Sequence, residues 1–330
     1  MKRREFIIVL GGGAAYPLAT RAQPSERTRR IGVLMGYAES DPDAQANVAA
    51  FREGLEKLGW AEGRNIRIDT RWPIPADVES MQRFSKELVA LQPDVILSHI
   101  TPTTAALLLQ TRTIPIVFAT VSDPVGSGFV ASFPQPGGNV TGFTSIEPTM
   151  SGKWLQLLKE IAPRVARVAL LFNPATAPYA EFFLNPLKAA AQSSGVEVIA
   201  ASVRDTSELE SVIAALAREP NSGLIVTPDS FMDVHRAEVT SLAARYRLPA
   251  VYPFHQFPEV GGLLSYGNDQ RDNYRRAAVY VDRILRGAKP SELPVQAPVK
   301  FELVINLNTA KALRLDVPLH LQQLADKVIE

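Results

Sequence analysis

Short apolar runs rich in β-branched residues alternate along the chain with longer segments whose apolar residues recur every three or four positions. The short runs predict buried parallel strands and the longer segments predict amphipathic helices. The expected strands are residues 31–35, 65–72, 94–98, 114–121, 139–143, 165–172, 196–203, 223–227, 249–252, 261–266 and 301–307. The expected helices are residues 44–59, 77–91, a segment from about 124, 154–161, 179–194, 209–216, 231–246 and 273–286. Such alternation predicts an α/β fold built on doubly wound parallel sheets.

Four expected strands run directly into a proline step, two in each half of the chain. The steps are Thr101-Pro102, Asp123-Pro124, Asn173-Pro174 and Thr227-Pro228. Each first residue is a type favoured at a helix N-cap, and proline suits the first helical position. Each step alone is explained as a good cap. Because ligands of open α/β sheets bind beyond the carboxyl ends of the strands, four matched steps favour one shared cleft between two halves.

Several long motifs resemble one known family. They are DPVGSGFVASFPQPGGNVTG at 123–142, GGLLSYGND at 261–269, RRAAVYVDRILRGAKPSELPVQ at 275–296 and KFELVINLNTAKAL at 300–313. Together they resemble the tryptophan-binding (TrpX-like) group of ABC-transporter substrate-binding proteins, over essentially the whole chain after its leader. The resemblance implies a type I periplasmic-binding fold, in which two doubly wound α/β lobes close through a hinge on a small ligand in a central cleft.

The resemblance also implies that the chain crosses between the lobes several times. We expect the crossings near residues 144–148, between residues 252 and 261, and in the proline-spaced segment 289–298. Lobe 1 is then expected to consist of residues 29–145 plus 258–291, and lobe 2 of residues 146–257 plus 292–330. Two domains suit a chain of 330 residues, which is too long for one ordinary core.

The first 22 residues have the pattern of a secretory signal peptide, followed by a polar linker at 23–28. A basic start precedes an apolar stretch, and small residues precede an expected cleavage after Ala22. Arg3-Arg4 also resembles a twin-arginine signal, so both the Tat and the Sec export routes stay open. Cleavage would remove four basic residues and one acidic residue, leaving 31 basic and 33 acidic residues and a net charge of −2.

The composition excludes several classes of function. The chain has 35 basic and 34 acidic residues, so no basic field indicates a nucleic-acid partner. It has no cysteine, which excludes disulfides, thiolate catalysis, cysteine-ligated metals and a lipid anchor at the signal cleavage site. No G-x-S-x-G nucleophile elbow occurs, and the first strand leads into no G-x-G-x-x-G turn. The four histidines have no metal-pair spacing, so we expect no cofactor, no metal and no catalytic residue.

The residues at strand ends suggest a small zwitterion as ligand, with an amino acid carrying an apolar or aromatic side chain as the best guess. The turn with Thr101 and Thr103 would take a carboxylate, and Asp123 or Asp229 would take an ammonium group unless each only caps its own helix. A neutral or anionic solute is the alternative, in which case both aspartates are structural. The expected site consists of Tyr37, Thr101, Thr103, Ser122, Asp123, Asn173, Tyr179, Asp229, Tyr252, Tyr266 and Asn268.

The sequence thus favours an exported, soluble and monomeric solute-binding protein of the periplasm. Its expected partners are a small-molecule ligand and, by the resemblance, an ABC permease with its ATPase. Two other classes stay open at this point: a sensory binding protein that reports to a receptor, and an enzyme on the same α/β scaffold.

Overall fold

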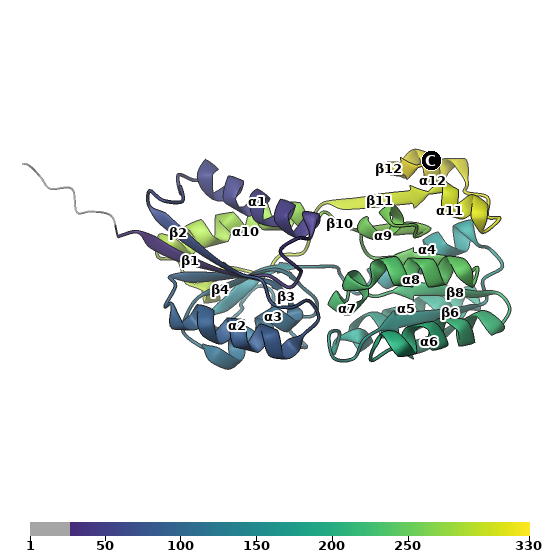
Figure 1. Cartoon of the computed structure of the whole chain (residues 1–330), viewed down its shortest axis with the longest axis horizontal. Helices are drawn as coiled ribbons and strands as arrows, with labels where there is room; N and C mark the ends of the chain where they lie inside the picture. The colour runs from purple at the N-terminus through teal and green to yellow at the C-terminus, as the bar shows by residue number, and fades with distance from the viewer. Residues whose placement is uncertain (1–26) are drawn as a thin grey trace, which may run out of the picture.

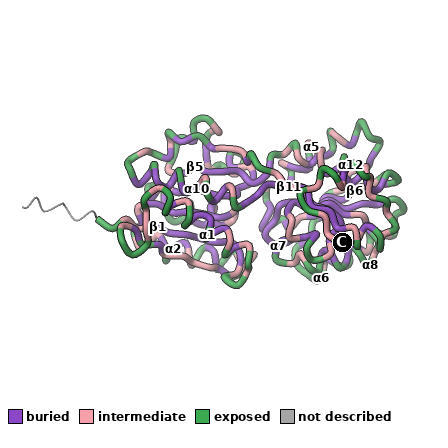
Figure 2. The backbone as a smooth tube through the Cα atoms, turned by 90° about the horizontal axis from the view of Figure 1, so that it is seen from above, coloured by how far each residue is buried: buried purple, intermediate pink, exposed green. Residues whose placement is uncertain are grey.

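The computed structural model describes residues 27–330, which form two α/β lobes lying end to end (Figure 1). The predicted signal peptide at 1–22 and residues 23–26 of the predicted linker lie outside the described residues. Buried backbone runs through the middle of each lobe, and exposed backbone follows the loops and outer helices (Figure 2). The predicted α/β class with two mostly parallel sheets is confirmed.

The first lobe contains a five-stranded parallel sheet in the order β2-β1-β3-β4-β5. Its strands are β1 (Arg29–Leu34), β2 (Ile66–Arg71), β3 (Val95–Ile100), β4 (Ile116–Val121) and β5 (Val140–Thr144). Side chains alternate between the two faces of a strand, so each face builds a separate core. One core includes residues of α1 (Pro42–Lys57) and α10 (Gln270–Leu285), and the other includes residues of α2 (Val78–Ala90) and α3 (Thr101–Gln110).

The second lobe contains a seven-stranded sheet in the order β12-β11-β10-β9-β8-β6-β7, in which β11 runs antiparallel to β10. Its strands are β6 (Arg167–Phe172), β7 (Glu197–Ser202), β8 (Ser222–Val226), β9 (Ala250–Tyr252), β10 (Leu264–Asn268), β11 (Phe301–Asn306) and β12 (Lys327–Ile329). Helix α5 lies on one side of this sheet and helices α6 and α8 on the other (Figure 2). Its helices are α4 (Met150–Ile161), α5 (Ala180–Ser194), α6 (Thr206–Arg218), α7 (Ser230–Val234), α8 (Arg236–Arg245), α9 (Gln256–Glu259), α11 (Leu307–Ala312) and α12 (Leu319–Leu324).

The chain crosses between the lobes in three places. It passes from β5 to α4, from β10 to α10, and from the short 3-10 helix η1 (Pro290–Glu292) to β11. At the second crossing the structure differs from the expected boundary, because β10 pairs with β9 and β11 in the second sheet. Residues 258–268 were expected in lobe 1, but the chain returns to the first lobe only after Asn268. Which sheet a strand joins depends on distant partners, which local sequence does not identify.

The three crossings are packed closely around Gly267. A Cβ atom built on this glycine would lie 1.7 Å from the carbonyl oxygen of Pro253 and 3.4 Å from Cδ1 of Ile146. Asp269 then caps α10 and forms an ion pair of 2.8 Å with Lys300 on the third crossing. The hinge is therefore a tightly packed junction in which a glycine is required for space.

The segment after β4 is not the predicted helix. Residues 124–139 form turns, and Asp123 itself has a positive φ of 44°, in the left-handed region. Its carboxylate accepts a hydrogen bond from the Gly126 amide at 2.8 Å, which closes one turn without starting a helix. Three more glycines and two prolines follow by residue 138, and they disfavour helix propagation.

The other proline steps also differ from expectation. Only Thr101-Pro102 opens a helix directly, with Ile100 and not Thr101 at the N-cap position. Helix α5 begins at Ala180, beyond the turn that follows Asn173. Helix α7 is capped by Asp229, two residues after Thr227, so the capping residue lies after the proline and not before it.

Candidate functional site

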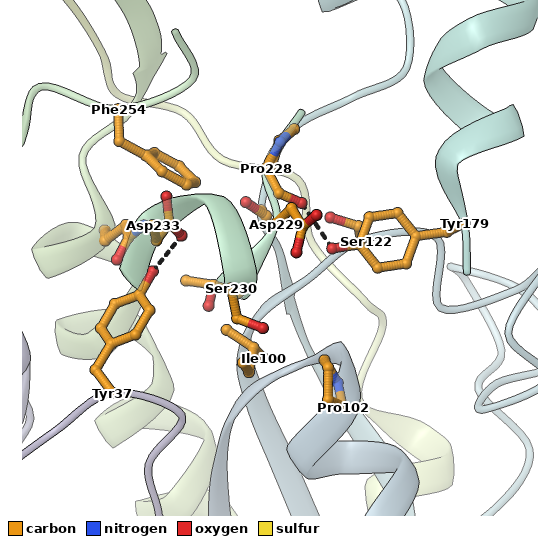
Figure 3. Close-up of a pocket in the computed structure, with 13 residues that line it drawn as sticks. Tyr37, Ile100, Pro102, Ser122, Tyr179, Pro228, Asp229, Ser230, Asp233 and Phe254 are labelled. Carbon is orange, nitrogen blue, oxygen red and sulfur yellow. Dashed lines mark hydrogen bonds between the residues drawn. The ribbon is translucent and has the colours of Figure 1, made fainter. Parts of the chain in front are cut away.

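A small cavity lies between the lobes, beyond the carboxyl ends of strands from both sheets (Figure 3). Its volume is ≈ 20 Å³. That space holds roughly one water molecule. The lobes are thus in contact across the cleft. The lining residues are Tyr37, Ile100, Pro102, Thr120, Ser122, Ser145, Tyr179, Pro228, Asp229, Ser230, Asp233, Phe254 and Gln270.

Asp233 on α7 is bonded across the cleft to the first lobe. The phenol of Tyr37, which follows β1, donates a hydrogen bond of 2.7 Å to Oδ2 of Asp233. The other carboxylate oxygen, Oδ1, is buried and has no hydrogen-bond partner among the described residues. Burial raises the pKa of Asp233 to about 8 and the charge of Asp229 adds to this, whereas the Tyr37 hydrogen bond and the charge of Arg236 act in the opposite direction. Asp233 therefore offers an unpaired carboxylate oxygen at the cavity wall. A cation placed beside it would favour the charged form of this carboxyl.

His99 supports Tyr37 from behind and does not line the cavity. The two rings meet edge to face with their centroids 4.5 Å apart. The Gly36 amide donates to Nδ1 of His99 at 3.2 Å, and complete burial lowers the pKa of His99 to about 3. His99 is consequently neutral, and it fixes the position of the ring that holds Asp233.

Asp229 is bonded within the second lobe. Its Oδ2 accepts from the Asn173 amide at 2.7 Å, and its Oδ1 accepts from the Phe231 amide at 2.9 Å and from the Thr176 hydroxyl. Burial raises its pKa to about 6, although these three hydrogen bonds act in the opposite direction. Because both oxygens already have donors, Asp229 serves mainly to join β6 to the start of α7.

Hydroxyl groups from both lobes line the rest of the cavity or support its lining. The Thr101 hydroxyl accepts a hydrogen bond of 3.0 Å from the Ser122 amide and so joins the ends of β3 and β4. The Thr120 hydroxyl donates to the His99 carbonyl at 2.9 Å. On the second lobe, the buried hydroxyl of Ser230 has no partner among the described residues. Unpaired polar atoms on this wall indicate a site for a polar group, because buried polar atoms are usually hydrogen-bonded.

A second, larger pocket adjoins the cavity and also lies between the lobes. Its volume is ≈ 470 Å³, and it shares Pro102 and Tyr179 with the small cavity. Tyr179 donates a hydrogen bond of 2.7 Å to the Pro228 carbonyl (Figure 3), and its side chain lines both spaces. We call the two spaces the inner cavity and the outer pocket. The outer pocket is lined by Val78, Gln82, Thr101, Pro102, Ala105, Ala106, Leu109, Asp123, Gly126, Ser127, Phe129, Ala175, Pro178, Tyr179, Glu181 and Phe182.

Two charged contacts also join the lobes. Arg236 of the second lobe lies 3.0 Å from Asp41 of the first, and His255 of the second lobe lies 3.6 Å from Asp43. Burial of His255 acts to lower its pKa. The hydrogen bond to Asp43 and the negative charges of Asp43 and two nearby glutamates act to raise it. The second effect is larger, so the pKa of His255 is raised. Together with the Tyr37–Asp233 bond, these contacts hold the lobes together.

The structure brings together part of the predicted site. Tyr37, Ser122, Tyr179 and Asp229 line the inner cavity, and Thr101, Asp123 and Tyr179 line the outer pocket. The remaining predicted residues line neither space: Thr103, Asn173, Tyr252, Tyr266 and Asn268.

Each of these remaining residues has another environment. Thr103 hydrogen-bonds within the start of α3, and Asn173 is bonded to the Arg204 carbonyl. Tyr252 stacks on Phe257 in the core, and Tyr266 stacks on Phe301. Asn268 is buried at the hinge.

Several lining residues, above all Asp233, were not predicted from the sequence. It lies inside the segment predicted as one helix over residues 231–246, where a single polar residue carries no distinctive signal. In the structure this segment is two helices, α7 and α8, with the break at His235. A short helix that directs Asp233 into the cleft was not distinguishable from the start of a long surface helix.

Comparison with known proteins identifies the family. Residues 36–329 match the family described as ABC transporter substrate binding protein. The chain belongs to this family. The resemblance found in the sequence is confirmed, and the enzyme alternative is set aside because the family consists of binding proteins.

This substrate-binding protein is similar to several characterised relatives. It is 26% identical over 292 residues to a tyrosine-binding protein of Clostridioides difficile, covering 88% of this chain and 82% of the relative. It is also 26% identical to the ABC domain of a Streptococcus pneumonia protein solved in complex with L-Trp, covering 92% of this chain and all of the other, with a TM-score of 0.84. The expected type I periplasmic-binding fold is confirmed.

A third relative is described as ligand-free and open. A ligand-free, open substrate-binding protein of Clostridium difficile is 25% identical, covers 91% of this chain and 99% of the other, and has a TM-score of 0.68. The higher score of 0.84 with the L-Trp complex, at nearly equal identity, agrees with the narrow inner cavity and the contacts across the cleft. In this structure the two lobes touch across the cleft.

Proposed function

We propose that this substrate-binding protein captures an amino acid with an apolar or aromatic side chain between its lobes and delivers it to an ABC permease. The observation that carries the proposal is the buried, unpaired Oδ1 of Asp233 at the wall of the inner cavity. A buried carboxylate with a free oxygen is a partner for an ammonium group. Relatives of this chain are described as tyrosine-binding and as bound to L-Trp, which supports the same class of ligand.

The proposal assigns the two charges of the ligand to different lobes. The ammonium group pairs with Asp233 of the second lobe. The carboxylate lies against the first lobe, near Ser122 and the N-terminal turn of α3, where free amides and the helix dipole favour an anion. A ligand held in this way joins the lobes, so binding stabilises the closed arrangement.

In this proposal the ammonium group of the ligand pairs with Asp233, and not with Asp123 or Asp229 as the sequence had suggested. Asp229 already accepts three hydrogen bonds from its own lobe. Asp123 lies in the outer pocket, and its carboxylate accepts from the Gly126 amide. Asp233 has an oxygen that lacks a partner, so it gains most from a cation.

We further propose that the protein works outside the cytoplasm. The leader at 1–22 supports export, with cleavage before Gln23. None of the helices within residues 27–330 is long and apolar enough to cross a membrane. N-terminal sequencing of the protein from its native cell tests this point, and a mature chain that begins at Met1 in the cytoplasm would contradict it.

The ligand is tested directly on purified protein. Mass spectrometry of ligand released by denaturation is followed by a thermal-shift screen of the twenty amino acids, sugars and aromatic carboxylates on refolded protein. At about a hundred times its dissociation constant a ligand adds about 2.7 kcal/mol, which raises the melting temperature by several degrees. Asp233→Asn should abolish the response, and Asp316→Asn, at an exposed position, is the matched control. A response to sugars or carboxylates with none to any amino acid would refute the proposal.

A further inference from the structure

A separate pocket lies at the end of the second lobe that is remote from the cleft. Its lining includes Val165, Asn221 and Pro249, which precede β6, β8 and β9 in the chain. These three strands are parallel, so their amino ends lie at one edge of the sheet, and the cleft lies beyond the opposite edge. Helix α11 lies at this outer end of the lobe (Figure 1). We call this space the distal pocket, and it shares no lining residue with the inner cavity or the outer pocket.

The distal pocket has the size and the apolar wall of a site for a small organic molecule. Its volume is ≈ 740 Å³. Ligand pockets typically have about 300–1,000 Å³. Ile161, Val165 and Leu248 line the pocket and are buried as part of the core of the second lobe. The apolar body of a ligand that packs against this wall would be removed from water, which favours binding.

Three arginines from three different loops line the same pocket. Arg164 lies between α4 and β6, Arg247 between α8 and β9, and Arg314 between α11 and α12. All three are exposed, and within residues 27–330 none of them has an ion pair or a side-chain hydrogen bond. Their guanidinium groups are therefore available to an anion.

The acidic residues of the lining do not neutralise these arginines. Glu219 forms an ion pair of 2.7 Å with Arg167, and Glu160 lies 3.0 Å from Nε2 of His320. Among the described residues, Asp316 is the one acidic lining residue without a basic partner. Three unpaired guanidinium groups and one unpaired carboxylate leave the pocket with an excess of positive charge.

Two of these arginines lie at positions where helices favour glycine. Arg247 and Arg314 have positive φ angles of 54° and 57°, and each follows the C-cap residue of its helix, α8 or α11. The left-handed backbone strains a residue that has a Cβ atom, which is why glycine is preferred there. A cation is favoured near a helix C-terminus, but Arg245 and Lys311 already supply one in the last turn of each helix. The two helices therefore do not themselves require arginine at these positions.

We propose that the distal pocket binds an organic anion. Its apolar body packs against Val165 and Leu248, and its carboxylate, sulfonate or phosphate group pairs with Arg247, Arg314 and Arg164. Guanidinium groups form charge-assisted, often bidentate hydrogen bonds with such oxyanions. This site is distinct from the cleft and does not depend on the amino acid proposed to bind there.

The test compares two fluorescent probes that differ by one charged group. Anilinonaphthalene sulfonate is an anion, and N-phenylnaphthylamine has the same apolar body without the sulfonate. Each is titrated into the purified protein at low and at high salt. The wild type should bind the anionic probe more tightly, and added salt should reduce the difference because it screens exposed charges.

The double variant Arg247→Gly with Arg314→Gly removes two guanidinium groups and relieves the left-handed strain. It should bind the anionic probe about tenfold more weakly and the neutral probe within about twofold of the wild type. Its melting temperature should not fall, because glycine adopts this backbone without strain. The matched control, Arg112→Gln with Arg275→Gln, removes the same charge from exposed positions of the first lobe and should bind both probes as the wild type does.

A second variant fills the pocket without changing its charge. Ala217, at the end of α6, is partly exposed and lines the distal pocket. Ala217→Trp should therefore weaken binding of both probes about tenfold. Ala215→Trp adds the same ring at an exposed position of the same helix outside the lining, and it should change neither. This pair tests the location even if the glycine variant folds poorly.

Four results would overturn the inference. The first is a wild type that binds the two probes equally tightly. The second is a glycine variant that keeps its affinity for the anionic probe or loses both probes equally. The third is an equal loss in the glycine variant and in its charge control, and the fourth is unchanged binding of both probes in Ala217→Trp. Failure of the amino-acid screen would refute only the proposed function, because the two sites share no residue.

Discussion

Ligand affinity should depend on pH through Asp233. Burial raises the pKa of this carboxyl to about 8, so near neutral pH the closed protein holds a proton there. An ammonium group binds the charged form, so binding must release that proton. The sign follows directly: affinity rises as the pH increases toward 8 and levels off above it.

The size of the effect follows from the pKa. The charged form makes up about one molecule in a hundred at pH 6 and about half at pH 8, so the association constant should rise about fiftyfold over this range. At pH 7 binding should release about 0.9 proton per ligand. These values apply when the lobes of the ligand-free protein are in contact, as in this structure, and the amino group of the ligand stays protonated over the same range.

Calorimetry in two buffers with different ionisation enthalpies measures both quantities. The observed binding enthalpy should differ between the buffers by the proton release multiplied by the difference in ionisation enthalpy. Asp233→Asn should bind weakly and show no pH dependence below pH 8, while Asp316→Asn should keep the wild-type slope. A dissociation constant that stays within about twofold from pH 6 to pH 8, with no buffer effect, would refute the reasoning.

Three further predictions concern contacts around the cleft. Tyr37→Phe removes the hydrogen bond to Asp233 and should weaken ligand binding about tenfold in calorimetry; unchanged affinity would show that this bond is unimportant for the site. The raised pKa of His255 means that its stabilising contribution is present below about pH 6.5 and is lost as the pH rises through the raised value. The wild type should therefore melt above His255→Gln at pH 5.5 but not at pH 9, and an equal difference at both would contradict this. Gly267→Ala places a Cβ atom 1.7 Å from the Pro253 carbonyl oxygen. It should reduce the free energy of unfolding by about 1–3 kcal/mol, and an unchanged melting curve would show that the hinge adapts.

The strands and the main helices of this fold were predictable because the spacing of their apolar residues along the sequence indicates which side chains are buried. Residues 114–121 are a continuous apolar run, and their strand β4 is buried throughout. The helix predicted from residue 124 was wrong because the Asp-Pro step was given more weight than the glycines that follow it. The sheet to which β10 belongs was not predictable locally, since its partners β9 and β11 are set by tertiary pairing.

The site was predictable in location but only partly in composition. Strand ends identified Tyr37, Ser122 and Tyr179, because parallel strands bring their carboxyl ends to one edge. Tyr252 also ends a strand, yet its ring turns into the core and stacks on Phe257. The direction of a side chain at a strand end depends on packing that the sequence does not reveal. For the same reason Asp233 was not predicted as a site residue.

The late return of the chain to the first lobe affects the order in which the protein can fold during synthesis. All five strands of the first sheet have been made by residue 144, but α10, which supplies Tyr274 and Val281 to one of its cores, begins only at residue 270. At 5–20 residues per second, that face of the sheet stays uncovered on the ribosome for on the order of 10 s. A partly built first lobe thus exposes apolar surface that chaperones can bind until α10 has been made.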